Sequence, residues 1–190
     1  CPHYLCLQAE EIQNKETHFK CAPPIRDNHN RNQLWKGLCD GIIDFIVSDH
    51  SPCIPQLKKL DTGNFMDAWG GISSLQLGLS SVWTTGADYG ISLIDVARWL
   101  SWRPSVFAGL QGKKGKISLG YDADFVVWDP NEQFVLEPQD LRFRHKLSPY
   151  LGKHLKGRVH YTYLRGQLVY NNGTIVGSPK GRPILFRRQE

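Results

Sequence analysis

The sequence lacks the patterns that define several large protein classes. No apolar run approaches the ~18 residues that a membrane-spanning helix needs, so no membrane span is predicted. Neither the G-x-G-x-x-G pattern of dinucleotide-binding folds nor a phosphate-binding P-loop occurs in it. These absences argue against a membrane protein and against an enzyme that uses a dinucleotide or a nucleoside triphosphate.

Cysteine is present, but it lacks the spacing of a metal or redox motif. The number of cysteines is odd, and no pair has the C-x-x-C spacing of a zinc knuckle or a dithiol site. This usage fits a reduced compartment, so we expect a soluble intracellular protein of the cytoplasm or of an organelle such as the mitochondrion or peroxisome. All the cysteines fall early in the chain: Cys1, Cys6, Cys21, Cys39 and Cys53.

The chain also lacks a concentrated basic patch. Its formal net charge is +5, but Lys and Arg are spread along the sequence in small groups. Such spacing favours an ordinary solvated surface over a site for nucleic acid or for a membrane. With 41% hydrophobic and 22% charged residues, the composition is that of a globular protein.

Methionine is almost absent. The chain begins with Cys1, and its only methionine is Met66. An initiator methionine is seldom removed to leave a residue as bulky as cysteine. We therefore expect these residues to be the C-terminal part of a longer protein.

The first 112 residues have the pattern of an α/β fold. Apolar residues at helical spacing predict a helix over residues 30–39, which Asp40-Gly41 ends. The apolar run at residues 42–47 is typical of a strand buried on both faces of a parallel sheet. We expect residues 1–7 to contain the end of a further strand. Other helices are predicted for residues 70–83, opened by Gly70-Gly71, for residues 92–101, capped by Ser92, and for residues 103–110, with Pro104 in the first turn.

The character of the chain changes after Gly112. Short runs rich in Val, Tyr, Phe and Thr, bounded by turn residues, predict an all-β region. Asn171-Asn172-Gly173 is a typical turn of a β-hairpin. We therefore expect two domains, residues 1–112 and residues 113–190. The predicted strands fall within residues 117–130, 134–138, 158–176 and 183–186.

The strongest candidate for chemistry is Asp49, within the heptapeptide IVSDHSP at residues 46–52. It follows the predicted buried strand, and α/β barrels place catalytic residues at the C-terminal ends of their strands. A carboxylate there can bind a metal ion and carry a proton. An Asp that caps the loop backbone gives the same local pattern, so the residues alone leave both interpretations open.

The other candidates have plain structural alternatives. His3 and His50 fit a metal ligand, a substrate donor or a packed side chain, and spacing alone favours packing. Gly70-Gly71 fits either a close approach of a ligand to the backbone or tight packing at a helix start. Cys21 and Cys53 are better explained as small buried thiols than as nucleophiles, because no base stands in fixed register with either. Surface or structural roles are predicted for the remaining histidines: His18, His29, His145, His154 and His160.

Seven blocks of sequence point together to one family. They are CPHY (1–4), KCAPPIRD (20–27), DGIIDFIVSDHSPC (40–53), NFMDAWGGISSLQ (64–76), KGKISLGYDADFVVWDP (114–130), FRHKLSPYLG (143–152) and YLRGQLVY (163–170). In order and spacing, over nearly the whole chain, they resemble the allantoinase family of cyclic amidohydrolases. That family has a (β/α)8 TIM barrel and a small β-sandwich. The resemblance implies that residues 1–112 are the C-terminal part of the barrel, with strands seven and eight and the helices that follow them, and that residues 113–190 are part of the sandwich.

The resemblance also implies roles for individual residues. Strand seven would end at CPHY and strand eight at IVSDHSP. Asp49 would ligate one ion of a binuclear divalent metal centre, for which zinc is expected, and would take the proton of the bridging hydroxide. His3 would be a pocket-wall residue and no ligand, which rejects a His3–Asp49 metal pair. The positions expected nearest the substrate ring, partly through backbone groups, are Ala22, Ser51, Trp69 and Gly70.

The implied activity is hydrolysis of the hydantoin ring of allantoin to allantoate, in purine catabolism, by a homotetramer when full length. A related hydrolase of dihydropyrimidines or dihydroorotate is the alternative within the class. Outside the class, the chain would be an inactive truncated product or an interaction module, because the family's other metal ligands precede the position of Cys1. One departure affects the pocket: Ala22 replaces the serine of the family's C-S-P-P and removes a hydroxyl.

Overall fold

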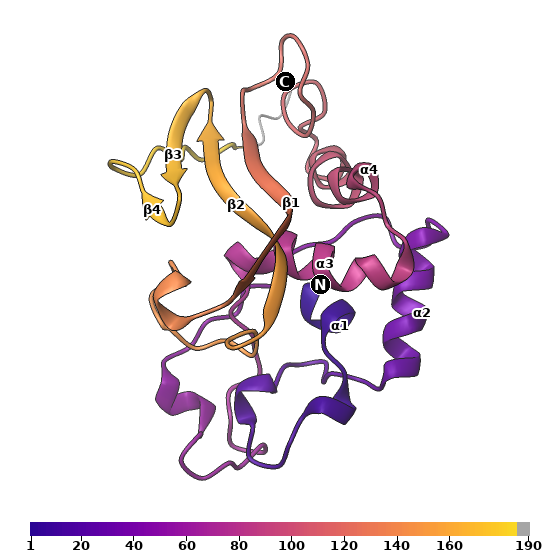
Figure 1. The fold of residues 1–190 in the computed structure, drawn as a ribbon, viewed down its shortest axis with the longest axis vertical. Coiled ribbons are helices and arrows are strands. Elements are labelled where there is room, and N and C mark those ends of the chain that lie inside the picture. The colour runs from indigo at the N-terminus through magenta and orange to yellow at the C-terminus, as the bar shows by residue number, and fades with distance from the viewer. Residues whose placement is uncertain (186–190) are drawn as a thin grey trace.

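The structure is a computed structural model that describes residues 1–185. Its helices lie in the N-terminal part of the chain and its sheet in the C-terminal part (Figure 1). No helix in the described range is long and apolar enough to cross a membrane. The helices are α1 (Pro2–Cys6), α2 (Asn28–Cys39), α3 (Gly78–Gly86), α4 (Leu93–Ala97) and α5 (Arg103–Phe107), with a π-helical turn at Arg98–Trp102. Short 3₁₀ turns occur at Ala9–Glu11, Thr17–Phe19, Pro55–Lys58, Leu75–Leu77, Ala87–Tyr89 and Pro138–Asp140.

The C-terminal part forms a four-stranded antiparallel sheet in the order β1-β2-β3-β4. The predicted turn joins β3 to β4, and Asn171 pairs with Thr174 across it. Asn172 and Gly173 have φ angles of 40° and 89°, the positive values that a two-residue hairpin turn of this kind requires. The hairpin prediction is confirmed. The strands are β1 (Phe125–Val135), β2 (His154–Leu164), β3 (Gln167–Asn171) and β4 (Thr174–Ile175).

Parts of the predicted strands have other structures. Residues 117–124 are turns and irregular backbone that lead into β1. Residues 183–185 form no strand in the described chain. Residue 186, which ends the predicted PILF strand, and the last residues of the predicted second domain lie outside the described residues.

Helix α2 forms as its local signals predict, starting two residues earlier. Asp27 caps its N-terminus, where the Asp27 side chain accepts a hydrogen bond of 2.7 Å from the N–H of Asn30. At the other end, Asp40 follows the last helical residue and Gly41 has a φ of 75°. The helix buries Trp35 and Leu38.

The buried strand predicted at residues 42–47 is wrong for the described chain. This segment has no sheet ladder within residues 1–185, and Ile42 and Val47 are exposed. Ile46 alone is buried, and its N–H donates to Trp99 O at 3.0 Å. A strand needs the backbone hydrogen bonds of a neighbouring strand, and no ladder forms with this segment in the described chain. One parallel bridge, between His50 and Ile72, occurs just beyond it.

Two further local predictions are corrected. Residues 2–6 form helix α1 and no strand, because Pro2 fits the first helical turn and Leu7 then returns to extended backbone. The helix predicted to open at Gly70-Gly71 begins later, at Gly78. Ile72 is held by its bridge to His50, so the backbone before α3 pairs with the segment after Asp49 instead of coiling.

The two last helices form one continuous helical run. Ser92 caps it as predicted: its side chain accepts from the N–H of Asp95, while the Asp95 carboxylate accepts from the N–H of Ser92. The run passes from α4 through the π-helical turn into α5 without a break, and Pro104 lies in the first turn of α5. Because proline has no backbone N–H, Pro104 cannot donate a hydrogen bond to the preceding turn of this run.

Helix α3 connects the helical part to the sheet (Figure 1). Ser80 Oγ donates to Gly157 O at 2.6 Å, and Trp83 Nε1 donates to Pro130 O at 2.8 Å. The core of the described chain consists of two hydrophobic clusters. One joins both parts of the chain and includes Leu7, Phe19, Ile72, Leu136, Leu141 and Tyr150. The other is helical and includes Leu5, Trp35, Leu38, Ile46, Val82 and Trp99.

Candidate functional site

Asp49 lies where the extended segment turns away from the helical core. Ile46, three residues earlier, is buried and anchors the segment, whereas the Asp49 side chain is 48% exposed. The φ of Asp49 is 45°, in the left-handed region that Asp tolerates better than most residues. The carboxylate therefore projects from an anchored segment, which leaves its oxygens available to a ligand.

His3 faces Asp49 from helix α1. Its Nε2 lies 3.6 Å from Asp49 Oδ2, and the imidazole is buried. Neither ring nitrogen has a hydrogen-bond partner among residues 1–185. Burial lowers the pKa of His3 to about 4, so the ring is neutral near pH 7. The contact is thus between a carboxylate and a neutral ring whose polar atoms are free for a further partner.

His50 has a structural role. Its Nδ1 accepts hydrogen bonds from the N–H groups of Ser74 (3.0 Å) and Leu75 (3.1 Å). An acceptor nitrogen carries no proton and its lone pair is already used, so Nδ1 is not free for a metal. Burial lowers the pKa of His50, in line with a neutral ring. The side chain holds the backbone that precedes α3, which supports the structural alternative for this residue.

The structure brings the four predicted substrate positions together. A Cβ added to Gly70 would lie 3.5 Å from Ala22 Cβ, an ordinary contact between the two loops. Ser51 and Trp69 both lie against Gly71, whose added Cβ would be 2.6 Å from Ser51 Cβ and 2.8 Å from Trp69 Nε1. Ser51 Oγ in turn donates to the carbonyl of Asp49 at 3.3 Å. The predicted residues form one contiguous group.

Two further residues belong to this group: Gly71, for which the sequence left a ligand contact and tight packing both open, and Lys58, which was not predicted to take part. Gly71 is the tight contact between the loops, since a side chain there would collide with Ser51. Lys58 is buried beneath them, and its ammonium donates to the carbonyls of Lys20, Trp69 and Gly71. The sequence around Lys58 reads as a surface loop, and nothing in it separates Lys58 from the neighbouring Lys59.

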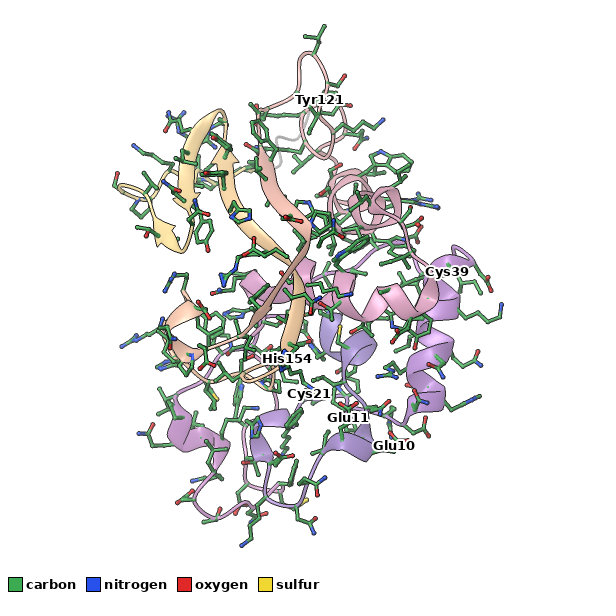
Figure 2. All side chains as sticks on the ribbon, in the orientation of Figure 1. Glu10, Glu11, Cys21, Cys39, Tyr121 and His154 are labelled. Atoms are coloured by element: carbon green, nitrogen blue, oxygen red, sulfur yellow. The ribbon has the colours of Figure 1, made fainter. Side chains whose placement is uncertain are left out.

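The two described cavities lie away from Asp49. One of about 240 Å³ is lined by residues that include Cys6, Glu11 and His154, and one of about 370 Å³ by residues on α3 and the sheet. Figure 2 places Cys21, which precedes Ala22, in the half of the molecule opposite the loop that carries Tyr121. Neither of these two linings includes Asp49 or the four positions predicted to bind substrate.

The residues around Asp49 fit part of a metal site. Cys1, His3 and Asp49 each offer one donor atom, and these atoms lie within 4.8 Å of one another. A half-exposed carboxylate is a common metal ligand, and a buried imidazole without a partner beside it is compatible with a bound group. Zinc in proteins has about three or four protein ligands, however, and Asp49 alone does not make a centre.

Comparisons with known proteins identify the family of the chain. Residues 4–169 match the amidohydrolase family. The chain is 50% identical over 175 residues to the allantoinase of Arabidopsis thaliana, which covers 91% of this chain and 34% of that protein. It is 45% identical over 190 residues to the allantoinase of Saccharomyces cerevisiae, which covers 100% of this chain and 40% of that protein. Among solved structures, it is similar to an L-hydantoinase (dihydropyrimidinase) from Arthrobacter aurescens, with a TM-score of 0.87 and 27% identity over 93% of this chain and 39% of that one.

The chain spans well under half the length of the relatives it matches, 34% and 40% of the two allantoinases. Its mixture of helices and sheet superposes on the hydantoinase with nearly complete coverage, so it has an amidohydrolase-type fold. The family match extends over most of the described residues, from helix α1 to strand β3. On this evidence, the chain belongs to the amidohydrolase family.

Proposed function

We propose that this chain is part of an allantoinase, which hydrolyses a C–N bond in the hydantoin ring of allantoin to give allantoate. The observation that carries the proposal is the contiguous group formed by Asp49 and the loops at residues 20–22 and 69–71. The similarity to two allantoinases over almost the whole chain supports it. The enzyme would be soluble, intracellular and a homotetramer.

We place residues 1–112 in the C-terminal part of a (β/α)8 barrel and residues 113–190 in a small β-sandwich. Two features support this division. The segment before Asp49 is extended, and the next segment of the site runs parallel to it at the bridge between His50 and Ile72. The sheet begins only at Phe125, after the last helix. In the full-length protein, the extended segment that ends at Asp49 would become strand eight by pairing with strands supplied by chain outside these residues.

We assign two roles to Asp49, metal ligand and carrier of the proton. It would be one ligand of a binuclear centre, most simply of zinc, with further ligands supplied by chain outside these residues. When bound, the metal ions lower the pKa of water and polarise the ring carbonyl. The Asp49 carboxylate accepts a proton from the attacking water and delivers it to the ring nitrogen that leaves. Its exposure and anchored backbone suit that transfer.

The loops would bind the ring. Ala22 and Gly70 offer backbone groups at the point where the loops touch, and Ser51 offers a hydroxyl next to Asp49. Trp69 is 45% exposed, and its indole would stack on a planar ring. Any contact of the family's serine hydroxyl is lost at Ala22, whereas a contact through the backbone of Ala22 would survive.

A hydrolase of dihydropyrimidines is the second candidate, since the structural neighbour is itself named a dihydropyrimidinase. The test is to assay the full-length protein that contains these residues with allantoin, dihydrouracil and dihydroorotate, and to measure bound metal. We expect allantoin to be the preferred substrate and about two metal ions per subunit, as in a binuclear site. Preference for dihydrouracil would favour the second candidate. Absence of both turnover and metal would favour an inactive product or interaction module.

A further inference from the structure

Lys58 is a buried charge in the loop that follows Asp49. It ends the 3₁₀ turn Pro55–Lys58 and is only 4% exposed, whereas lysine is almost always at the surface. Lys59 follows it with a φ of 52°, which turns the chain back toward solvent. Burial of an ammonium costs free energy unless its donors are satisfied, so the contacts of Lys58 need an explanation.

All three donors of the ammonium have an acceptor. Nζ donates to Lys20 O at 2.8 Å, to Trp69 O at 3.0 Å and to Gly71 O. An ammonium has three N–H donors, so the set is complete. No carboxylate within residues 1–185 pairs with Lys58, and its charge is met by the dipoles of three carbonyl groups. Bonds from a charged donor are stronger than those between neutral groups.

The three carbonyls belong to the two loops assigned to the substrate. Lys20 lies two residues before Ala22, while Trp69 and Gly71 flank Gly70. Only one backbone bond in the described chain joins the loops directly, from the N–H of Gly71 to Lys20 O at 3.0 Å. Lys58 adds three hydrogen bonds to this single one, and together they hold carbonyl groups of both loops around its ammonium.

We propose that Lys58 is a positioning residue, whose ammonium locks the loops at residues 20–22 and 69–71 together and thereby sets the affinity for the hydantoin substrate. The inference rests on the proposed function, because it takes these loops as the substrate-binding surface. Lys58 is buried, and all three donors of its ammonium are taken by loop carbonyls, so none is left for a substrate. Its effect passes through Ala22 and Gly70, whose relative position it determines.

The charge state of Lys58 is consistent with this role. Burial lowers the pKa of Lys58 to about 8, and the groups that face it are Cys53, Cys21 and Lys20. The three carbonyl acceptors favour the charged form and oppose that shift. At pH 7 the ammonium keeps all three donors, whereas the neutral amine would keep only two.

The test uses the full-length protein that contains these residues, with Lys58→Met, Lys58→Gln and, as a matched control, Lys59→Met. We expect Lys58→Met to raise the KM for allantoin about tenfold or more with little change in kcat, because misplaced binding groups cost affinity. Amide hydrogen exchange at residues 20–22 and 69–71 should become faster in the same variant. Lys58→Gln keeps two donors on a shorter side chain, so its KM and its exchange rates should lie between those of the wild type and of Lys58→Met. The KM and exchange rates of Lys59→Met should equal those of the wild type.

The outcomes separate this inference from the proposed function. If the wild type does not hydrolyse allantoin, the proposed function fails, and the hydrogen exchange still decides whether Lys58 locks the loops. Unchanged exchange and unchanged KM in Lys58→Met would overturn the inference while leaving the function intact. A fall in kcat with KM unchanged would also overturn it, since that would place Lys58 in the chemistry. If Lys58→Met fails to fold, Lys58→Gln carries the same comparison.

Discussion

The loops around Asp49 and the hairpin between β3 and β4 are both irregular backbone, but different forces hold them. The hairpin is closed by residues adjacent in sequence, with Asn171 paired to Thr174 across the turn. The loops are joined over long separations: Lys58 and Lys20 are 38 residues apart, and His50 and Ser74 are 24 apart. Single side chains make those long connections, so one substitution should disturb the loops far more than the hairpin.

The largest expected effect of a single substitution in the loops is at Asp49 itself. In the full-length protein, Asp49→Asn should lower kcat for allantoin by about 10³-fold, because an amide cannot accept the proton. The matched control is Asp44→Asn on the same segment, whose carboxylate is 62% exposed and lies 3.8 Å from Arg103. An exposed ion pair of this kind contributes little to stability. Equal activity of Asp49→Asn and wild type would remove the catalytic assignment.

The helical core gives the next largest effect. Trp35 is completely buried, stacks on Tyr89 at 4.8 Å and donates to Leu5 O at 2.8 Å. Trp35→Ala should lower the free energy of unfolding by about 3–5 kcal/mol. The control is Trp102→Ala, at a tryptophan that is 36% exposed, and it should lower the free energy of unfolding clearly less. Thermal melting of both variants measures the difference, and equal melting temperatures would contradict the assignment of Trp35 to the helical core.

A substitution at Gly71 disturbs the contact between the loops without removing any charge. A methyl group at Gly71 would lie 2.6 Å from Ser51 Cβ and 2.9 Å from Ser51 O, which forces the loops apart. Gly71→Ala should therefore raise the KM for allantoin about tenfold, with a smaller effect on stability. Gly78→Ala is the control, because its added methyl group would meet only Pro2 Cγ at 3.8 Å. A KM for Gly71→Ala equal to that of the control would show that loop spacing does not govern binding.

The difference between contacts that are local in the sequence and contacts over long separations also explains what could be predicted from the sequence. Helix α2, the Ser92 cap and the Asn171-Asn172-Gly173 turn follow from residues close together in the chain, and each forms as predicted. The apolar run at residues 42–47 was predicted to be a strand, but strand pairing depends on neighbours that the local pattern does not contain. The late start of α3 was missed for the same reason, since a long-range bridge decides it, whereas helix α1 was missed although its signal, Pro2 in the first turn, is local.

For the site, the resemblance supplied the residues and the structure supplied their connection. Ala22, Ser51, Trp69 and Gly70 lie together as expected, but their roles in binding stay predictions. Lys58 could not be found from the sequence, because its burial depends on three carbonyls in segments up to 38 residues away. A lysine in a loop with prolines is ordinarily solvated, and only the packed loops make this one different.

The smallest expected effect is a pH dependence at the Ser92 cap, where the contacts are local. Hydrogen bonds from the Ser92 side chain and backbone lower the pKa of Asp95 from its ordinary value of 3.8. A carboxyl group with a lowered pKa stabilises the fold above pH 3.8, and that stabilisation is lost as the pH falls through the lowered pKa. Asp95→Asn should therefore cost about 0.5–1 kcal/mol at pH 7, the range of a helix cap.

Thermal melting of wild type and Asp95→Asn from pH 7 down to pH 3 measures this contribution. The two melting curves should differ at pH 7 and converge at the acid end, because the protonated carboxyl no longer accepts both bonds from Ser92. The KM for allantoin should be the same in both proteins, since the cap lies in the helical run and contacts neither substrate loop. A constant difference at every pH would show that packing, and not the charge of Asp95, supports the start of α4.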